Sequence, residues 1–577
     1  MAGMKFSSWS RRLSIAAWGL LIAGFGLLAY GALTGGGDNT DSETEVADSA
    51  TPATGDPADN PDETTTTGQP PAELARAAEA ALAKLDKPGA VDSGEPFGLV
   101  DGEVNRRLAN ATIPPFLVGS RDSAPLELPD VDAVYSQDIE PILESTCASC
   151  HTTGQAGASA LLLNNAGEAV AEAEFISRVT HAQVMPPWPA SNESVEFAGN
   201  YSLSAEEIAL IVDWADKGAP LDVPASTPIE SSRPTSYLED PDLVLTSTYG
   251  AYEGSADVED DYRCLIFDAG VTEQEWVLAS HFVPDQTEVV HHGIITLASA
   301  GLREQADALD AEDEKPGWTC YGGSGLEGGT DGFERRMGGW APGAQPNRRP
   351  EGYAIPINPD DFFVVQIHYH YNDAAPADLT EFHLDLASDE QIAAQGGAYA
   401  ALRSALYLGP AEIPCYDDDT NPLCDRDVAL QRVIDLYGSR VGSFSNFFLF
   451  ACESSVDDYT EMTDGTAWST CDLDVVNPGR IVTVAGHMHE LGMGIRLTLN
   501  PDTPEEKILL DIPKWDFEWQ LGYSPVDEII IDANDTIRVD CAWNRELAPY
   551  DPVGYVLWAD GTGDEMCYSS ITTAPVN

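Results

Sequence analysis

The pattern of apolar and polar positions divides this chain into a helical part and a longer part made of strands. A helix is predicted within 201–220, because Ser204 and Glu207 fit a capping box, apolar residues recur at helical spacing, and Gly218 marks the stop. From about residue 235, short β-rich runs alternate with Gly, Pro, Asn and Asp, which is typical of sandwiches and barrels. The clearest runs are FFVVQIHYHY (362–371), GRIVTVAGHMH (479–489), IRLTLN (495–500) and EIIIDANDTIRVDCAW (528–543).

These patterns predict a multidomain, mainly β chain with a small all-α domain. The compact helical domain is expected over 128–224. The strand-rich remainder is too long for one sandwich, so two in tandem are expected, at 235–400 and 401–577. Residues 35–127 are rich in Asp, Thr, Glu, Pro and Gly and are expected to form a disordered acidic linker, with one helix-prone stretch at 71–86.

Residues 1–34 have the composition of a membrane-targeting segment. Lys5, Arg11 and Arg12 form a basic start, and 13–33 is apolar and uncharged. At about 1.5 Å per residue this stretch is about 31 Å long, enough to cross a bilayer. The length favours an uncleaved transmembrane anchor over a cleaved signal peptide. Because the basic side stays in the cytoplasm, the bulk of the chain is expected in the periplasm or outside the cell.

The chain is strongly acidic, with 96 Asp and Glu against 29 Lys and Arg and a net charge of −67. Such a surface repels nucleic acid and anionic lipid headgroups, so neither is an expected partner. The acidic excess runs through the whole chain. This spread favours adaptation to high salt over the alternative, a local face that steers a partner.

The ten cysteines fall into two groups. Two belong to the run Cys147-Ala148-Ser149-Cys150-His151, and the other eight are an even number in an exported chain, which predicts four disulfides.

The CxxCH run is the attachment pattern of a c-type haem, with two thiols for the vinyl groups and His151 for an axial position. A thioredoxin-like dithiol and half a zinc site are the alternatives, but neither the βαβ pattern of the first nor the second ligand pair of the other is found. Met185, held by two prolines, is the expected sixth ligand, with His181 as the alternative. The segment resembles a class I cytochrome c domain.

Most other histidines lie in three groups within the strand-rich part. The groups are His291-His292, His368-Tyr369-His370 and His487-Met488-His489. Residues i and i+2 share one face of a strand, so the third group can point at one metal. Adjacent His291 and His292 can do so only where the strand ends or bulges, as Gly293 permits. Imidazole clusters suit zinc, copper, nickel or iron, and a thioether would favour Cu(I).

The strand-rich part resembles the copper type II, ascorbate-dependent monooxygenases, the family of the peptidylglycine α-hydroxylating and dopamine β-monooxygenases. The resemblance covers about 235–577 and implies two copper ions, one in each jelly-roll-like sandwich. An electron-transfer copper would take His291, His292 and His368 of the Gln-Ile-His-Tyr stretch. An oxygen-activating copper would take His487, His489 and Met566 of the Met-Cys pair.

Further matches and departures accompany this resemblance. The Gly339–Gly343 turn matches the family, and the resemblance implies the disulfides Cys541–Cys567 and Cys264–Cys320. His370 is a departure, interpreted as a hydrogen-bonding residue rather than one that perturbs the copper. Met493 is a nearer alternative to Met566 but lacks the Met-Cys motif. The regions of Cys415–Cys424 and Cys452–Cys471 have no family counterpart.

The resemblance implies hydroxylation of a C–H bond in a small organic substrate by O2, with His487, His489 and Met566 at the catalytic centre. Because one oxygen atom becomes water, two electrons are needed. The fused haem is expected to relay them to the first copper from an external donor, ascorbate or another cytochrome. The alternative is a non-catalytic electron-transfer or copper-binding protein, which needs no open coordination position.

Overall fold

The computed structural model describes residues 112–117 and 128–576, apart from short gaps. The gaps are 156, 159–160, 234–236, 239, 256–257, 259, 288, 322, 327–332, 341–343, 345, 372–373, 518 and 548–553. The predicted membrane anchor and the helix-prone stretch at 71–86 lie outside the described residues. Among the helices that the structure describes, none is both long and apolar enough to cross a membrane.

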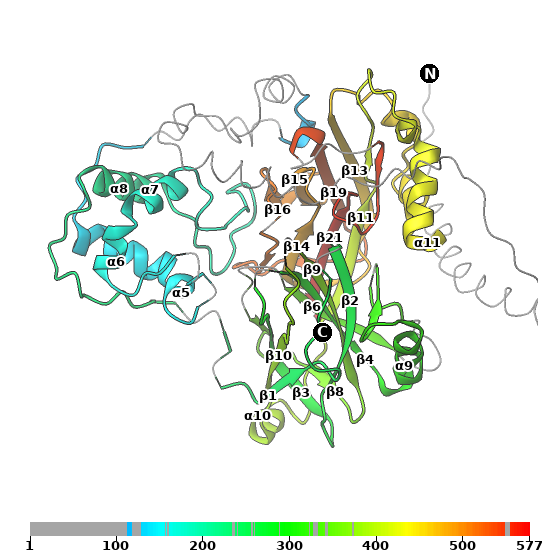
Figure 1. The fold of residues 1–577 in the computed structure, drawn as a ribbon, viewed down its shortest axis with the longest axis horizontal. Coiled ribbons are helices and arrows are strands. Elements are labelled where there is room, and N and C mark those ends of the chain that lie inside the picture. Colours follow the sequence, from blue (N-terminus) through cyan, green and yellow to red (C-terminus); the bar gives the residue numbers. More distant parts are fainter. Residues whose placement is uncertain are drawn as a thin grey trace, which may run out of the picture. The chain divides into compact units, whose positions relative to one another are not determined.

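The helical part begins with one continuous helical stretch and continues with three separate helices (Figure 1). The last of these confirms the predicted caps: the Ser204 hydroxyl accepts from the Glu207 N–H, and Gly218 follows with φ 81°. Its Trp214 packs against Tyr135, with ring centroids 5.7 Å apart. The elements are η2 Tyr135–Ile139, α4 Glu140–Ile142, η3 Leu143–Cys147, α5 Ala148–His151, α6 Ala166–Ala171, α7 Ala173–His181 and α8 Ala205–Asp216.

The chain after α8 returns onto these helices. The Ile229 N–H donates to Asn164 O, and the Ser232 N–H donates to Glu144 O. Ile229 is buried in the same apolar core as Trp214. The helical part therefore extends some residues past position 224.

Two antiparallel sheets form the first β-sandwich, and one apolar cluster with residues from both sheets fills it. Its first sheet has β1 Leu243–Thr246, β10 Glu381–Leu386, β3 Glu275–Val283, β7 Asn347–Arg348 and β8 Ile355–Ile357. The other has β5 Trp318–Thr319, β2 Asp260–Asp268, β9 Phe362–His370, β4 Val290–Ala298 and β6 Glu334–Trp340. Helices α9 (Arg303–Glu312) and α10 (Asp389–Ala394) lie in its connections.

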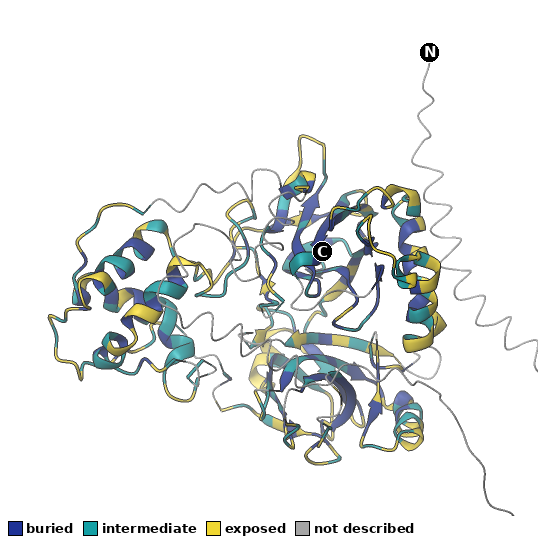
Figure 2. Ribbon diagram, turned by 45° about the horizontal axis from the view of Figure 1, so that its top comes forward, coloured by how far each residue is buried: buried dark blue, intermediate teal, exposed yellow. Residues whose placement is uncertain are grey.

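The second β-sandwich has the same plan, with its own core. One sheet has β11 Arg403–Gly409, β21 Cys567–Ala574, β14 Gly479–His487, β17 Gly522–Tyr523 and β18 Ile530–Ile531. The other has β13 Thr466–Asp474, β19 Thr536–Asn544, β15 Gly492–Leu499 and β16 Lys507–Ile512, while β12 Glu412–Ile413 pairs with β20 Val556–Leu557. The prediction of a mainly β chain is confirmed, and the buried residues concentrate in these strands (Figure 2).

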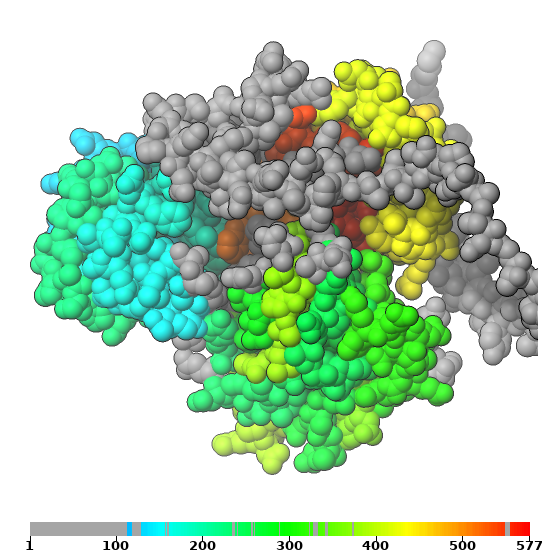
Figure 3. All heavy atoms as spheres, viewed as in Figure 1, coloured from blue at the N-terminus to red at the C-terminus, as the bar shows by residue number. Residues whose placement is uncertain are grey.

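One long helix of the second sandwich was not expected from the sequence. Helix α11 (Arg426–Ala451) contains a break at Gly438, whose φ is 87°. Its spheres, yellow in Figure 3, lie at the surface of this part of the chain. Two disulfides, Cys415–Cys424 and Cys452–Cys471, flank the two ends of the helix.

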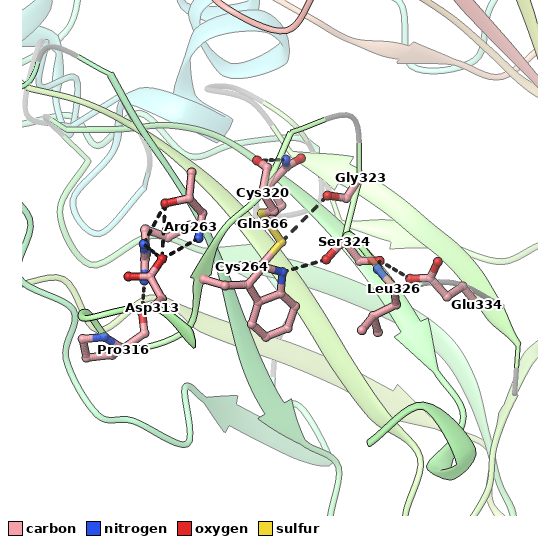
Figure 4. The surroundings of a disulfide bond; sticks show 12 residues. Arg263, Cys264, Asp313, Pro316, Cys320, Gly323, Ser324, Leu326, Glu334 and Gln366 are labelled. Carbon is pink, nitrogen blue, oxygen red and sulfur yellow. Dashed lines mark hydrogen bonds and ion pairs between the residues drawn. A yellow bond between two sulfur atoms is a disulfide. The ribbon is translucent and has the colours of Figure 1, made fainter. Parts of the chain in front are cut away.

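All four predicted disulfides are present, and Cys147 and Cys150 are free thiols. Both pairings implied by the resemblance, Cys264–Cys320 and Cys541–Cys567, are confirmed. Figure 4 shows the surroundings of Cys264–Cys320, where the Gln366 amide donates to Cys320 O at 2.9 Å. This contact ties the strand that carries His368 to the disulfide.

Residues 188–201 leave the helical part and pack against the second sandwich. Phe197 is buried in the core of that sandwich, and its backbone forms a bridge with Pro525. Two N–H groups of this segment donate to carbonyls of β16: Ser191 N–H to Asp511 O, and Val195 N–H to Ile508 O. Within the predicted linker, the described stretch 112–117 also packs there, with Leu117 fully buried.

Candidate metal centres

Three imidazoles of the first sandwich converge through their Nδ1 atoms. His291 Nδ1 lies 3.2 Å from His292 Nδ1, which lies 3.3 Å from His368 Nδ1. Ligand nitrogens bound tetrahedrally at about 2.0–2.1 Å from one ion are about 3.3 Å apart, so the spacing fits a single metal. All three ligand atoms lie within 4.8 Å of one another. The structure thus brings together the first predicted ligand set.

Local backbone irregularity makes this convergence possible. The register between β4 and β9 shifts between Val290 and His292, which is the bulge that the adjacent histidines require. The residue after the two histidines has no room for a side chain, because a Cβ at Gly293 would lie 2.7 Å from a ring carbon of Phe282. The glycine is therefore explained by this close packing. The Tyr262 ring stacks on the His368 imidazole, with ring centroids 4.2 Å apart and an angle of 6° between the ring planes.

Asp260 orients the imidazole of His368 and gives His370 a hydrogen-bond partner. Its Oδ1 accepts from His368 Nε2 at 2.7 Å and from His370 Nδ1 at 3.0 Å. A proton on Nε2 leaves the lone pair of His368 on Nδ1, the atom that faces the other two imidazoles. Burial raises the pKa of Asp260, but the bonds from the two histidines outweigh it and hold the pKa well below its usual range.

In the second sandwich, two imidazoles use Nδ1 for a hydrogen bond, whereas in the first cluster Nδ1 is the atom that converges. His487 Nδ1 lies 2.5 Å from Gln520 Oε1, and His489 Nδ1 lies 3.0 Å from Asp564 O. Both acceptors require a proton on Nδ1, which leaves the lone pairs on Nε2. The ring centroids of the two histidines are 5.1 Å apart. The pair therefore offers two oriented nitrogen ligands.

Met566 lies on the chain segment that borders this pair. Tyr568 pairs with His487 in the β14–β21 register, and Asp564 O binds His489, so Met566 lies between the two points of contact. Met493 instead packs in another cluster, with Leu117 and Ala542. The placement of Met566 agrees with its expected role better than that of Met493.

A buried carboxyl group, Glu565, fixes the segment that carries Met566. Four N–H groups donate to Glu565: those of the His489, Leu491 and Met566 backbones and the Trp543 indole. Burial raises the pKa of Glu565 to about 8 despite these donors. One side chain thereby fixes both His489 and Met566 in position.

The two clusters face each other across the contact between the sandwiches. The ring centroids of His292 and His487 are 6.5 Å apart, and the Phe517 ring lies 4.7 Å from His291 and 6.0 Å from His489. Arg336 of the first sandwich donates to the Tyr568 hydroxyl of the second at 2.7 Å. The histidine clusters therefore share one site at the junction of the sandwiches.

Burial keeps four of these imidazoles neutral. It lowers the pKa of His368 and His489 to about 4 and that of His487 to about 3, and it lowers the pKa of His292 well below its usual value. A neutral imidazole is the form that binds a metal.

In the CxxCH run, hydrogen bonds fix the imidazole of His151, the expected axial ligand. His151 Nδ1 lies 3.0 Å from both Gly157 O and Leu161 O, so its proton is on Nδ1 and its lone pair on Nε2. Cys147 packs at the margin of the helical core, and burial raises its pKa to about 12. Met185 is half-buried in the loop after α7, outside that core cluster, while His181 is exposed at the end of α7. The cysteines and His151 fit a haem; the sixth ligand stays a prediction.

Comparisons with known proteins add little. No protein-family model matches the chain, and no curated protein matches it. Among solved structures it is similar to a xanthan lyase of Paenibacillus, with 10% identity over 59% of this chain and 25% of that chain and a TM-score of 0.14. It is also similar to an allantoicase, with 12% identity over 51% of this chain and 81% of that chain and a TM-score of 0.11. The chain thus spans about a quarter of the xanthan lyase, and at these scores neither likeness supports a conclusion.

Three supporting residues were not predicted from the sequence: Asp260, Gln520 and Glu565. Each acts through a ligand expected from the sequence. Asp260 is opposite His370 in the β2–β9 register, which no local pattern reveals. Glu565 could have been suspected because it directly precedes Met566.

Proposed function

We propose that the chain is a copper-dependent monooxygenase that hydroxylates a C–H bond of a small organic substrate with O2. The observation that carries this proposal is the pair of facing histidine clusters, in which different ring nitrogens converge. One offers three Nδ1 atoms, and the other offers two Nε2 atoms beside a methionine. Two unlike centres suit a reaction that needs both electron storage and oxygen activation, which is the chemistry that bound copper supplies.

The chain's own residues have clear tasks in this proposal. His291, His292 and His368 would hold one ion, and His487, His489 and Met566 the other. The thioether would favour the reduced state of the second ion. Phe517, which lies against both clusters, would keep bulk water from the space between them.

The fused helical part suits the delivery of electrons. A haem attached at Cys147 and Cys150 would supply single electrons from an external donor, ascorbate or another cytochrome. The segment 188–201, between α7 and α8, contacts the second sandwich through Trp188, whose ring centroid lies 5.2 Å from that of Tyr523. Tyr523 lies in β17, which pairs with β14, the strand that ends at His487, so this contact is on the sheet that carries the second cluster.

The four disulfides support a location in an oxidising compartment. We therefore place the bulk of the chain in the periplasm or outside the cell, attached to the membrane by the segment at 13–33.

The test is oxygen-18 incorporation by the copper-loaded, haem-containing chain, with ascorbate as donor and a panel of small organic substrates. Turnover with label in the product is expected for the parent chain and for Met493→Leu, a swap of similar volume. Met566→Leu should lose turnover. Equal turnover of the two variants would refute the role of Met566. Binding of both metals without oxygen uptake on any substrate would support the alternative, a non-catalytic electron-transfer or copper-binding protein.

A further inference from the structure

Two histidines outside the three groups lie side by side on the first sandwich. His281 of β3 and His383 of β10 are direct cross-strand partners. Directly opposed residues project from the same face, with Cβ atoms about 4.5–5.5 Å apart. Their sheet is not the one that carries His291, His292 and His368, so the pair is separate from the site described above.

Each of these imidazoles has a buried nitrogen atom without a hydrogen-bond partner. His281 is 4% exposed, and its Nδ1 has no partner; His383 Nδ1 is also buried and has none. Buried polar atoms are normally satisfied, and two orphaned nitrogens on neighbouring side chains leave two desolvated sites unused.

The tautomer of His383 makes its orphaned nitrogen a ligand. His383 Nε2 lies 2.7 Å from Glu381 Oε2, so the proton is on Nε2 and the lone pair is on Nδ1. This is the carboxylate–histidine arrangement that orients metal ligands. Asp385, two residues further along β10, is on the same face and adds a second carboxylate.

We infer that His281 and His383 form a further metal site for a divalent cation of the zinc and copper class. Two imidazole nitrogens with carboxylates nearby suit Zn²⁺, Cu²⁺ or Ni²⁺ better than the oxygen-seeking Mg²⁺ or Ca²⁺. Water completes the coordination, because among the described residues no third His, Cys or carboxylate joins this pair within 4.8 Å. Asp385 is instead paired with Arg348, whose Nη1 lies 3.6 Å from Asp385 Oδ2.

The test counts zinc ions in the full, haem-containing chain by equilibrium dialysis and elemental analysis, after metals are stripped. The double variant His281→Gln/His383→Gln should bind one ion fewer than the parent chain. Glu381→Gln should keep the ion at saturation but bind it about 10–100-fold more weakly. Glu390→Gln, an exposed carboxylate of α10, is the matched control and should bind as the parent does.

An equal zinc count in the parent and the double variant would overturn the inference. If the double variant does not fold, His383→Gln alone decides, because a zinc affinity unchanged from the parent contradicts the site equally. The result is independent of the oxygenase proposal. Loss of the ion from His487→Ala/His489→Ala reports on that proposal, and this zinc count reports on the His281–His383 pair.

Discussion

Replacing Asp260 by asparagine isolates the effect of one charge on the first histidine cluster. The amide oxygen of Asp260→Asn can still accept from His368 Nε2, so the imidazole keeps its tautomer while the negative charge is lost. In the parent chain the two histidine bonds keep the pKa of Asp260 low, so the carboxylate is ionised throughout the neutral range.

The expected effect is weaker copper binding at one cluster only. Loss of a carboxylate that supports a ligating histidine typically lowers metal affinity about 10–100-fold. That corresponds to about 1.4–2.8 kcal/mol of binding free energy. Because Asp260 hydrogen-bonds to His368 alone among the six proposed copper ligands, the second cluster should keep its affinity.

The assay is competition between the metal-stripped chain and a coloured Cu(I) chelator, which resolves two binding steps. Asp268→Asn is the matched control, because Asp268 lies at the far end of the same strand and also carries one charge. It should leave both affinities unchanged. If Asp260→Asn binds copper within threefold of the control, the carboxylate does not support the ligand and the reasoning from its hydrogen bonds is wrong.

Three other substitutions have equally specific outcomes. Gln520→Leu removes the acceptor of the His487 Nδ1–H and should weaken copper binding at the second cluster about tenfold, with the first unchanged in the same competition assay. Replacing Cys264 and Cys320 by serine opens a loop with a sequence separation of 56 and should cost about 4 kcal/mol in denaturant unfolding; a loss below about 1 kcal/mol would contradict this. Burial raises the pKa of Asp540 to about 6, so the parent loses stability as pH rises from 4 to 6. Asp540→Asn should therefore raise the thermal midpoint at pH 8, and the gain should vanish near pH 4.

The sequence predicted the elements whose information is local. The capped helix before Gly218, the runs that became β9, β14 and β15, and the irregularity at Val290–His292 all follow from neighbouring residues. The run at 528–543 became two strands, β18 and β19, because the turn at 532–535 separates them.

The missed features depend on contacts between distant segments. Asp260 reaches His368 only because β2 and β9 pair in one register. The packing of 188–201 on the second sandwich joins residues more than 300 positions apart, such as Ser191 and Asp511. Helix α11 was missed for a different reason: Gly438 interrupts its apolar pattern, and the disulfides beyond its ends mark it only in three dimensions.

The central claim is that the second cluster holds copper through two imidazoles and one thioether. X-ray absorption of the reduced, copper-loaded chain tests it most directly, because sulfur and nitrogen ligands scatter differently. We predict one sulfur scatterer per two coppers in the parent and in Met493→Leu, and none in Met566→Leu. A spectrum without sulfur in the parent, or one that Met566→Leu leaves unchanged, would contradict the account.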